Sequence, residues 1–204
     1  MGKRYRCADG FTLIELMIVV AILSVVAVLA VSSYSRYVRH SAKSEVYAML
    51  GEIRAKQEAY MAESGTYLSA THTAAGTTDT DIHPQLAGAS EFTTKNWQPL
   101  ADTRWSTGLG VNPPRGQLYC GYVTIAGPAG TKPSGVNGAN TAGDAILAAL
   151  MPGGAAPTRP WFYARACCDF DVGATAYTGC TSMTDLSTFE ISVADGVVRE
   201  HMEQ

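Results

Sequence analysis

An apolar run near the start of the chain constrains its fold more than any other feature. Residues 11–31 read FTLIELMIVVAILSVVAVLAV, and only Thr12, Glu15 and Ser24 interrupt the apolar side chains. About 20 such residues are enough for a helix to cross the hydrocarbon core of a membrane. Three basic residues lie within residues 1–10, so the positive-inside rule places the N-terminus in the cytoplasm. We therefore expect a basic leader at residues 1–10, a membrane-spanning helix at 11–31, and a remainder that faces the periplasm or the outside.

A cleaved secretory signal peptide is the main competing interpretation of this run. Such peptides have an apolar core of about 7–15 residues, followed by a small-residue cleavage site. Here the run is longer, and a helical pattern continues beyond it. One apolar stripe at helical spacing comprises Val46, Met49, Leu50, Ile53 and Tyr60. We expect one nearly continuous helix from about Phe11 to about Ser64. Its second half, residues 32–65, is amphipathic, and Gly65 is a candidate left-handed cap.

The composition changes after residue 65, and we expect residues 66–204 to form a globular head. Most of residues 66–115 read as loop. Runs rich in β-branched and aromatic residues predict four strands, at Gln117–Ile125, Pro160–Cys167, Ser187–Val193 and Val197–Met202. The Asp195-Gly196 pair predicts a hairpin between the last two strands, and Asp144–Met151 predicts a short helix.

These elements predict an α+β fold, in which an antiparallel sheet of about four strands covers the amphipathic half of the helix. The strands carry several aromatic residues, which we interpret as sheet core rather than as a ligand platform. They are Tyr119, Tyr122, Trp161, Phe162 and Tyr163.

Charge and motif content argue against several function classes. The net charge is −3, and no basic stretch is long enough to follow a phosphate backbone, so nucleic-acid binding is not predicted. The four histidines are scattered, and the sequence contains no nucleophile elbow, phosphate-binding loop or zinc-peptidase motif. We therefore expect neither an enzyme nor a cofactor.

Glu15 is the unusual residue of the apolar run. A carboxylate inside a membrane costs several kcal/mol, so an intramembrane acid suggests a function. If the chain were cut before Phe11, the new α-amino group at the start of the helix could neutralise Glu15 of the same or a neighbouring subunit. The alternative is a signal anchor that tolerates Glu15, because this residue is only one helical turn into the run and could reach the interface.

The string GFTLIELMIVVAIL, which begins at Gly10, closely resembles the prepilin peptidase site and filament helix of type IV pilins and type II secretion pseudopilins. The resemblance implies that the peptidase cuts between Gly10 and Phe11 and methylates the new Phe11 amine. It also implies that Glu15 pairs with the N-terminal amine of an adjacent subunit. The implied partners are other pilin subunits, the prepilin peptidase and an inner-membrane assembly platform. The protein would lie in the inner membrane before assembly, and then in an extracellular pilus or a periplasmic pseudopilus.

Three functions follow from this resemblance and its alternatives. The first is a major or minor subunit of a type IV pilus that serves adhesion, motility or DNA uptake. The second is a pseudopilin of a type II secretion system. The third is a signal-anchored periplasmic binding domain, which would retain its leader. Many major pilins have a helix-breaking proline where this chain has Ser32, and this departure favours a minor pilin or a pseudopilin.

The cysteines of the head predict disulfides rather than a zinc site, because the adjacent Cys167 and Cys168 cannot easily bind one tetrahedral ion. Four cysteines allow three pairings. We favour Cys120 with Cys167 or Cys168, across neighbouring strands, and Cys180 with the other, which resembles the disulfide-bounded C-terminal region of many type IV pilins.

A short acidic fragment in the same part of the head resembles half of a calcium loop. Asp169 and Asp171 stand at the spacing of calcium ligands, and some pseudopilins bind calcium near the C-terminus. The fragment lacks the glutamate that completes an EF-hand loop, so we favour a solvated acidic turn.

Overall fold

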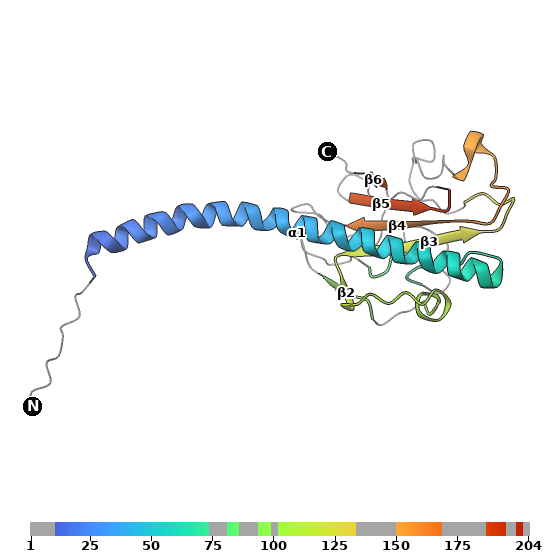
Figure 1. The fold of residues 1–204 in the computed structure, drawn as a ribbon, viewed down its shortest axis with the longest axis horizontal. Coiled ribbons are helices and arrows are strands. Elements are labelled where there is room, and N and C mark those ends of the chain that lie inside the picture. Colours follow the sequence, from blue (N-terminus) through green and yellow to red (C-terminus); the bar gives the residue numbers. More distant parts are fainter. Residues whose placement is uncertain are drawn as a thin grey trace, which may run out of the picture. The chain divides into compact units, whose positions relative to one another are not determined.

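The computed structural model describes residues 11–73, 81–85, 94–98, 102–133, 150–168, 187–194 and 199–201. The long helix α1 (Leu13–Ser64) is followed by strands and short helical turns, shown in Figure 1. These are β1 (Lys95–Asn96), a π-helical turn (Arg104–Gly108), β2 (Gln117–Leu118), β3 (Cys120–Gly127), a 3-10 turn (Pro152–Gly154), β4 (Trp161–Cys168), β5 (Ser187–Ser192) and β6 (Arg199–His201). The chain divides into two compact units, Met1–His40 and Ser41–Gln204.

Helix α1 begins at Leu13 and ends at Ser64, close to the predicted bounds of about Phe11 and about Ser64. Residues at its C-terminal end explain why the helix stops there. Gly65 adopts a φ of 74°, a left-handed conformation that glycine reaches without steric cost. Its N–H donates to the carbonyl of Met61 at 2.9 Å, and the Ser64 hydroxyl donates to the carbonyl of Tyr60 at 2.7 Å. The predicted cap at Gly65 is therefore confirmed.

A four-stranded antiparallel sheet forms the centre of the second unit, with the strand order β3-β4-β5-β6 (Figure 1). The predicted α+β fold is confirmed, and each predicted strand has a counterpart. The pairing of β5 with β6 agrees with the predicted hairpin, although its Asp195-Gly196 turn lies outside the described residues. The predicted helix Asp144–Met151 also falls mostly outside them.

Two expectations about the first half of the head are wrong. The single strand predicted at Gln117–Ile125 is interrupted at Tyr119, so that β2 pairs with β1 while β3 pairs with β4. The reason is that the Tyr119 N–H donates to the Glu45 carboxylate at 3.0 Å instead of to a neighbouring strand. Residues 66–115 are also more than loop, because they contain β1 and the π-helical turn.

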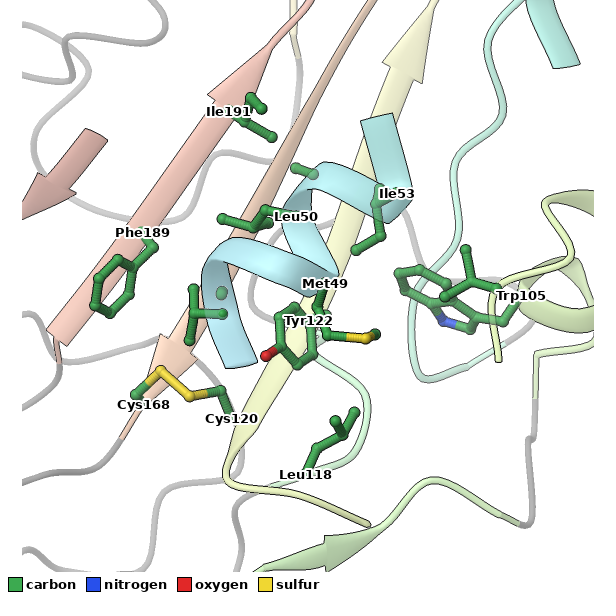
Figure 2. Packing of buried hydrophobic residues seen from close by; sticks show 14 of the residues in the cluster. Met49, Leu50, Ile53, Trp105, Leu118, Cys120, Tyr122, Cys168, Phe189 and Ile191 are labelled. Atoms are coloured by element: carbon green, nitrogen blue, oxygen red, sulfur yellow. A yellow bond between two sulfur atoms is a disulfide. The ribbon is translucent and has the colours of Figure 1, made fainter. Parts of the chain in front are cut away.

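The amphipathic half of α1 packs against one face of this sheet. The predicted stripe is confirmed, because four of its members are fully or nearly fully buried and Tyr60 packs against them. Figure 2 shows Leu50 and Ile53 of the helix among side chains from the sheet and the adjoining loops, including Tyr122, Phe189 and Trp105. The hydrophobic effect of this layer is the main force that holds the helix on the sheet.

The opposite face of the sheet is covered as well. A second cluster contains Ile82, Val123, Ile125, Leu150, Trp161, Tyr163 and Cys167. Strand β4 is therefore buried along its whole length, which explains why its sequence lacks the alternation of a half-exposed strand. The interpretation of the aromatic residues as sheet core is confirmed. Tyr119 is partly buried against the core between α1 and the sheet, and the remaining four, Tyr122, Trp161, Phe162 and Tyr163, are buried.

Segments from the long connection after α1 close the free edge of β3. Ala70 pairs with Thr124 and His83 pairs with Tyr122, each through two backbone hydrogen bonds of 2.7–3.0 Å. The approach at Gly121 is so close that a Cβ there would lie 2.6 Å from Ile82 and 2.7 Å from the Pro84 carbonyl oxygen. Only glycine fits this position without a shift of the neighbouring chain.

Candidate functional site

The N-terminal part of α1 exposes an apolar surface on every side. All the large hydrophobic side chains that flank Glu15, from Phe11 to Leu29, are at least 47% exposed. The stretch Leu13–Ala30 has a mean hydropathy of 2.9 and none of its residues is buried, so by length and composition this helix could cross a membrane. An exposed apolar surface of this size requires a cover, either lipid or other helices.

A capping box starts this helix. The Glu15 carboxylate accepts hydrogen bonds through Oε2 from the Thr12 N–H at 3.0 Å and the Thr12 hydroxyl at 2.8 Å. In return, the Glu15 N–H donates to Thr12 Oγ1 at 3.3 Å. This reciprocal arrangement satisfies backbone donors that an α-helix leaves free at its first turn. The acid therefore has a structural role within its own chain.

The carboxylate also keeps one oxygen without a partner. Among the described residues, Glu15 Oε1 accepts no hydrogen bond, whereas Oε2 accepts both bonds from Thr12. The only other polar side chain between Glu15 and Ala30 is Ser24, whose hydroxyl donates to the Ala21 carbonyl at 2.8 Å. The Ser24 hydroxyl thus needs no outside partner, while Glu15 retains a free acceptor at the start of the helix.

The structure describes one of the two residues of the predicted processing site. Phe11 directly precedes the capped turn and is 80% exposed, whereas Gly10 lies outside the described residues. The role of Thr12 was missed by sequence reasoning. A Thr-x-x-Glu pattern directly before an apolar run is a capping-box signal and would have identified it.

Ser32, where many major pilins have proline, lies within continuous helix, because α1 extends without interruption from Leu13 to Ser64. A serine keeps the backbone N–H that proline lacks, so the hydrogen-bond ladder of the helix is preserved there. This segment of α1 is therefore helical in the single chain.

The cysteines of the head form the predicted kind of crosslink. Cys120 and Cys168 are joined by a disulfide, and they are directly opposite each other in the register of β3 and β4. Cys167 is also disulfide-bonded. Its predicted partner, Cys180, lies outside the described residues, as do the calcium candidates Asp169 and Asp171. Within the described ranges no three metal-binding side chains are clustered.

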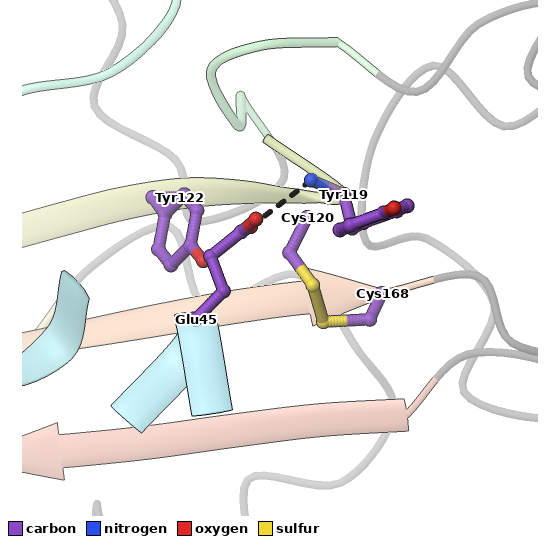
Figure 3. The surroundings of a disulfide bond; sticks show 5 residues. All are labelled: Glu45, Tyr119, Cys120, Tyr122 and Cys168. Carbon is purple, nitrogen blue, oxygen red and sulfur yellow. Dashed lines mark hydrogen bonds between the residues drawn. A yellow bond between two sulfur atoms is a disulfide. The ribbon is translucent and has the colours of Figure 1, made fainter. Parts of the chain in front are cut away.

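A partly buried acid of α1 lies beside this disulfide, as Figure 3 shows. Glu45 accepts hydrogen bonds from the Tyr119 N–H at 3.0 Å and from the Tyr122 hydroxyl at 3.3 Å. Burial raises the pKa of Glu45 above its usual value, although these donors and the nearby Arg115 act in the opposite direction. Glu45 thus joins the helix to the start of β3 and costs some stability when it ionises.

A second polar cluster holds the segments that cover the edge of β3. The Nδ1 atoms of His72 and His83 are 2.9 Å apart, and His83 Nε2 is 2.7 Å from the Trp97 carbonyl oxygen. Because a carbonyl can only accept, His83 must carry its proton on Nε2 and accept from His72 through Nδ1. Burial lowers the pKa of His83, and the neighbouring His72 adds to this effect.

Asp102 anchors the same cluster on its other side. It accepts from the Thr71 N–H at 3.0 Å and forms an ion pair with Arg104 at 2.7 Å. Burial alone would raise the pKa of Asp102, but the hydrogen bonds from Arg104 and Thr71 outweigh it and lower the pKa. The cluster is a structural network and shows no arrangement of nucleophile and base.

One region of the chain matches a known protein family. Residues 5–31 match the family described as the prokaryotic N-terminal methylation motif, which is typical of type IV pilins and pseudopilins. No curated protein and no solved structure matches the chain.

Proposed function

We propose that the chain is a type IV pilin-like filament subunit that is cut between Gly10 and Phe11 and methylated at Phe11, because residues 5–31 carry the N-terminal methylation motif. The observation that carries this proposal is the uncovered apolar helix with Glu15 held at its start. Such a helix is stable in lipid before assembly, and in a bundle of equivalent helices afterwards. Pilins are generally structural rather than enzymatic proteins, in accord with this role.

The geometry of Glu15 suggests how processing and assembly are coupled. Cleavage before Phe11 creates an α-amino group, which is a cation at neutral pH. Glu15 Oε2 is already used by Thr12, so the free Oε1 is the acceptor for the amine of an adjacent subunit. One carboxylate would then cap its own helix and set the axial position of its neighbour. In a low-dielectric environment this pair would be much stronger than in water.

The filament could belong to either of two systems, a type IV pilus or a type II secretion pseudopilus. A type IV pilus is supported by the disulfides of the head, which suit an exposed filament surface in an oxidising compartment. A type II secretion pseudopilus is supported by the uninterrupted helix at Ser32. Deletion of the gene separates the two candidates, because it would abolish pili in one case and enzyme secretion in the other.

Intact mass and N-terminal sequencing of protein sheared from cells test the processing step. The expected product begins at methylated Phe11 and occurs in the filament fraction. A chain that retains Met1–Gly10 and stays in the membrane would overturn the proposal, and would support the signal-anchored binding domain instead.

Three variants separate the two roles of Glu15. Glu15→Ala removes both the cap and the charge, whereas Glu15→Gln retains a hydrogen-bond acceptor for Thr12 but removes the charge. Thr12→Ala weakens the cap, by about 1 kcal/mol, and leaves the charge. All three should be cleaved, but only Thr12→Ala should assemble well. Normal filaments from Glu15→Gln would show that the charge pair is not needed.

A further inference from the structure

Two exposed tyrosines follow the apolar segment of α1. Tyr34 is 70% exposed and Tyr37 is 72% exposed, while the membrane-compatible stretch ends at Ala30. Residues three apart lie on neighbouring positions of one helix face. Neither hydroxyl has a hydrogen-bond partner within the part of the chain that the structure describes. A tyrosine combines an apolar ring with a polar end, which suits a boundary between an apolar and an aqueous medium.

The distance between these tyrosines and Glu15 matches the thickness of a bilayer. Tyr34 follows Glu15 by 19 positions of continuous helix, which is about 29 Å at 1.5 Å per residue. The hydrocarbon core of a typical bilayer is about 30 Å thick. When Glu15 lies at one boundary of the hydrocarbon, Tyr34 therefore lies at the other, and Tyr37 lies about 4.5 Å further out, among the headgroups.

We infer that Tyr34 and Tyr37 form an interfacial anchor that binds the phospholipid headgroup layer and sets the depth of the helix, so that Glu15 lies at the opposite boundary. Tyrosine is enriched at such interfaces. The inference rests on the proposed membrane-anchored precursor, and it assigns a lipid-binding site that the filament role does not require.

Glu15 and the two tyrosines each resist a shift of the helix across the membrane, and they resist shifts in opposite directions. A shift toward the Glu15 side draws the hydroxyls of Tyr34 and Tyr37 into hydrocarbon, where an unpaired hydroxyl is costly. A shift the other way draws the Glu15 carboxylate inward, which costs more because it carries a charge. The helix therefore has one preferred depth, and Glu15 avoids most of the cost of an intramembrane acid until assembly.

Fluorescence quenching in vesicles tests the depth directly. The full chain with Tyr34→Trp, or with Leu23→Trp as a mid-membrane reference, is placed in phosphatidylcholine vesicles with bromine either near the headgroup or near the end of the acyl chains. Trp97, Trp105 and Trp161 are buried in the head, so the signal of the parent chain is subtracted. We expect at least twofold stronger quenching of Tyr34→Trp by the shallow bromine, and the reverse order for Leu23→Trp.

Two results would overturn the anchor. Stronger quenching of Tyr34→Trp by deep bromine would place this position inside the hydrocarbon, and no quenching by either lipid would place it against protein or in water. A chain that does not enter the membrane fraction at all would instead contradict the proposed precursor, so the two failures are distinguishable.

A second measurement tests whether the tyrosines set the depth. In the Leu23→Trp background, Tyr34→Phe with Tyr37→Phe should raise the ratio of shallow to deep quenching, because without the two hydroxyls the helix can move toward the Glu15 side. Tyr47→Phe is the matched control, because Tyr47 is an exposed tyrosine of the other unit. An unchanged ratio in the double variant would assign the depth to other residues and refute the inference.

Discussion

Removal of the Cys120–Cys168 disulfide should destabilise the head by about 4 kcal/mol. The two cysteines are 48 positions apart, and closing a loop of that length removes chain entropy from the unfolded state worth about 4 kcal/mol at 25 °C. Both residues are fully buried, so their replacement by alanine leaves no polar group without a partner. For a protein of this size, such a loss lowers the melting temperature by about 8–16 °C.

The assay is guanidinium unfolding of the purified chain in detergent, followed by the fluorescence of the three buried tryptophans. The Cys120→Ala, Cys168→Ala double variant should have a lower midpoint and a larger m-value, because its unfolded chain exposes more surface without the crosslink. Alkylation and mass spectrometry verify that Cys167 is still oxidised in this variant. A loss below about 1 kcal/mol with an unchanged m-value would refute the argument that the crosslink acts by restricting the unfolded chain.

The remaining predictions concern packing and pH. Gly121→Ala should lower the free energy of unfolding by about 1–3 kcal/mol, because the new Cβ has no room. Gly51→Ala lies at an exposed helical position with open space around it, and it should stabilise the protein by up to about 1 kcal/mol. Equal effects of the two changes in unfolding measurements would contradict the packing described for β3. Because the folded-state pKa of Glu45 is raised, its contribution to stability is present below about pH 4.5 and is lost as the pH rises through the folded value. Glu45→Gln should therefore gain stability relative to the parent as the pH rises, and an unchanged difference between the two proteins in unfolding measurements would contradict the raised pKa. The folded-state pKa of His83 is lowered, so its contribution is present above about pH 6.5 and is lost as the pH falls through the folded value. NMR titration of the His83 ring, together with unfolding from pH 7.5 to 5, checks this, and a ring that titrates above its usual pKa would reverse the expected sign.

Most of the long helix could be predicted without coordinates. Its apolar length, its stripe of buried residues and its glycine cap are properties of neighbouring residues, and local sequence reports them directly. The capping box of Thr12 and Glu15 is equally local, and its Thr-x-x-Glu pattern was available before the structure. Strand positions could also be predicted, because β-branched and aromatic runs favour extended backbone.

The details of the head depended on contacts between distant residues. No local pattern shows that the Tyr119 N–H is taken by Glu45, 74 positions earlier in the chain, and this contact divides one predicted strand into two. Nor does the sequence of β4 show what covers its second face. Ile82 and Leu150 cover that face, and both lie outside β4 in the sequence, so no short stretch of sequence predicts their contact with the strand.

The cysteines show the same division between local and tertiary information. The sequence by itself predicted a disulfide framework and favoured a pairing of Cys120 with Cys167 or Cys168 across neighbouring strands, among three possible pairings. Only the tertiary structure decided for Cys168, because the register places Cys168 opposite Cys120, and successive side chains of a strand point to opposite faces of the sheet. The apolar N-terminal helix and its acid can likewise be identified from neighbouring residues, whereas the choice between two adjacent cysteines required the alignment of two strands more than 30 residues apart.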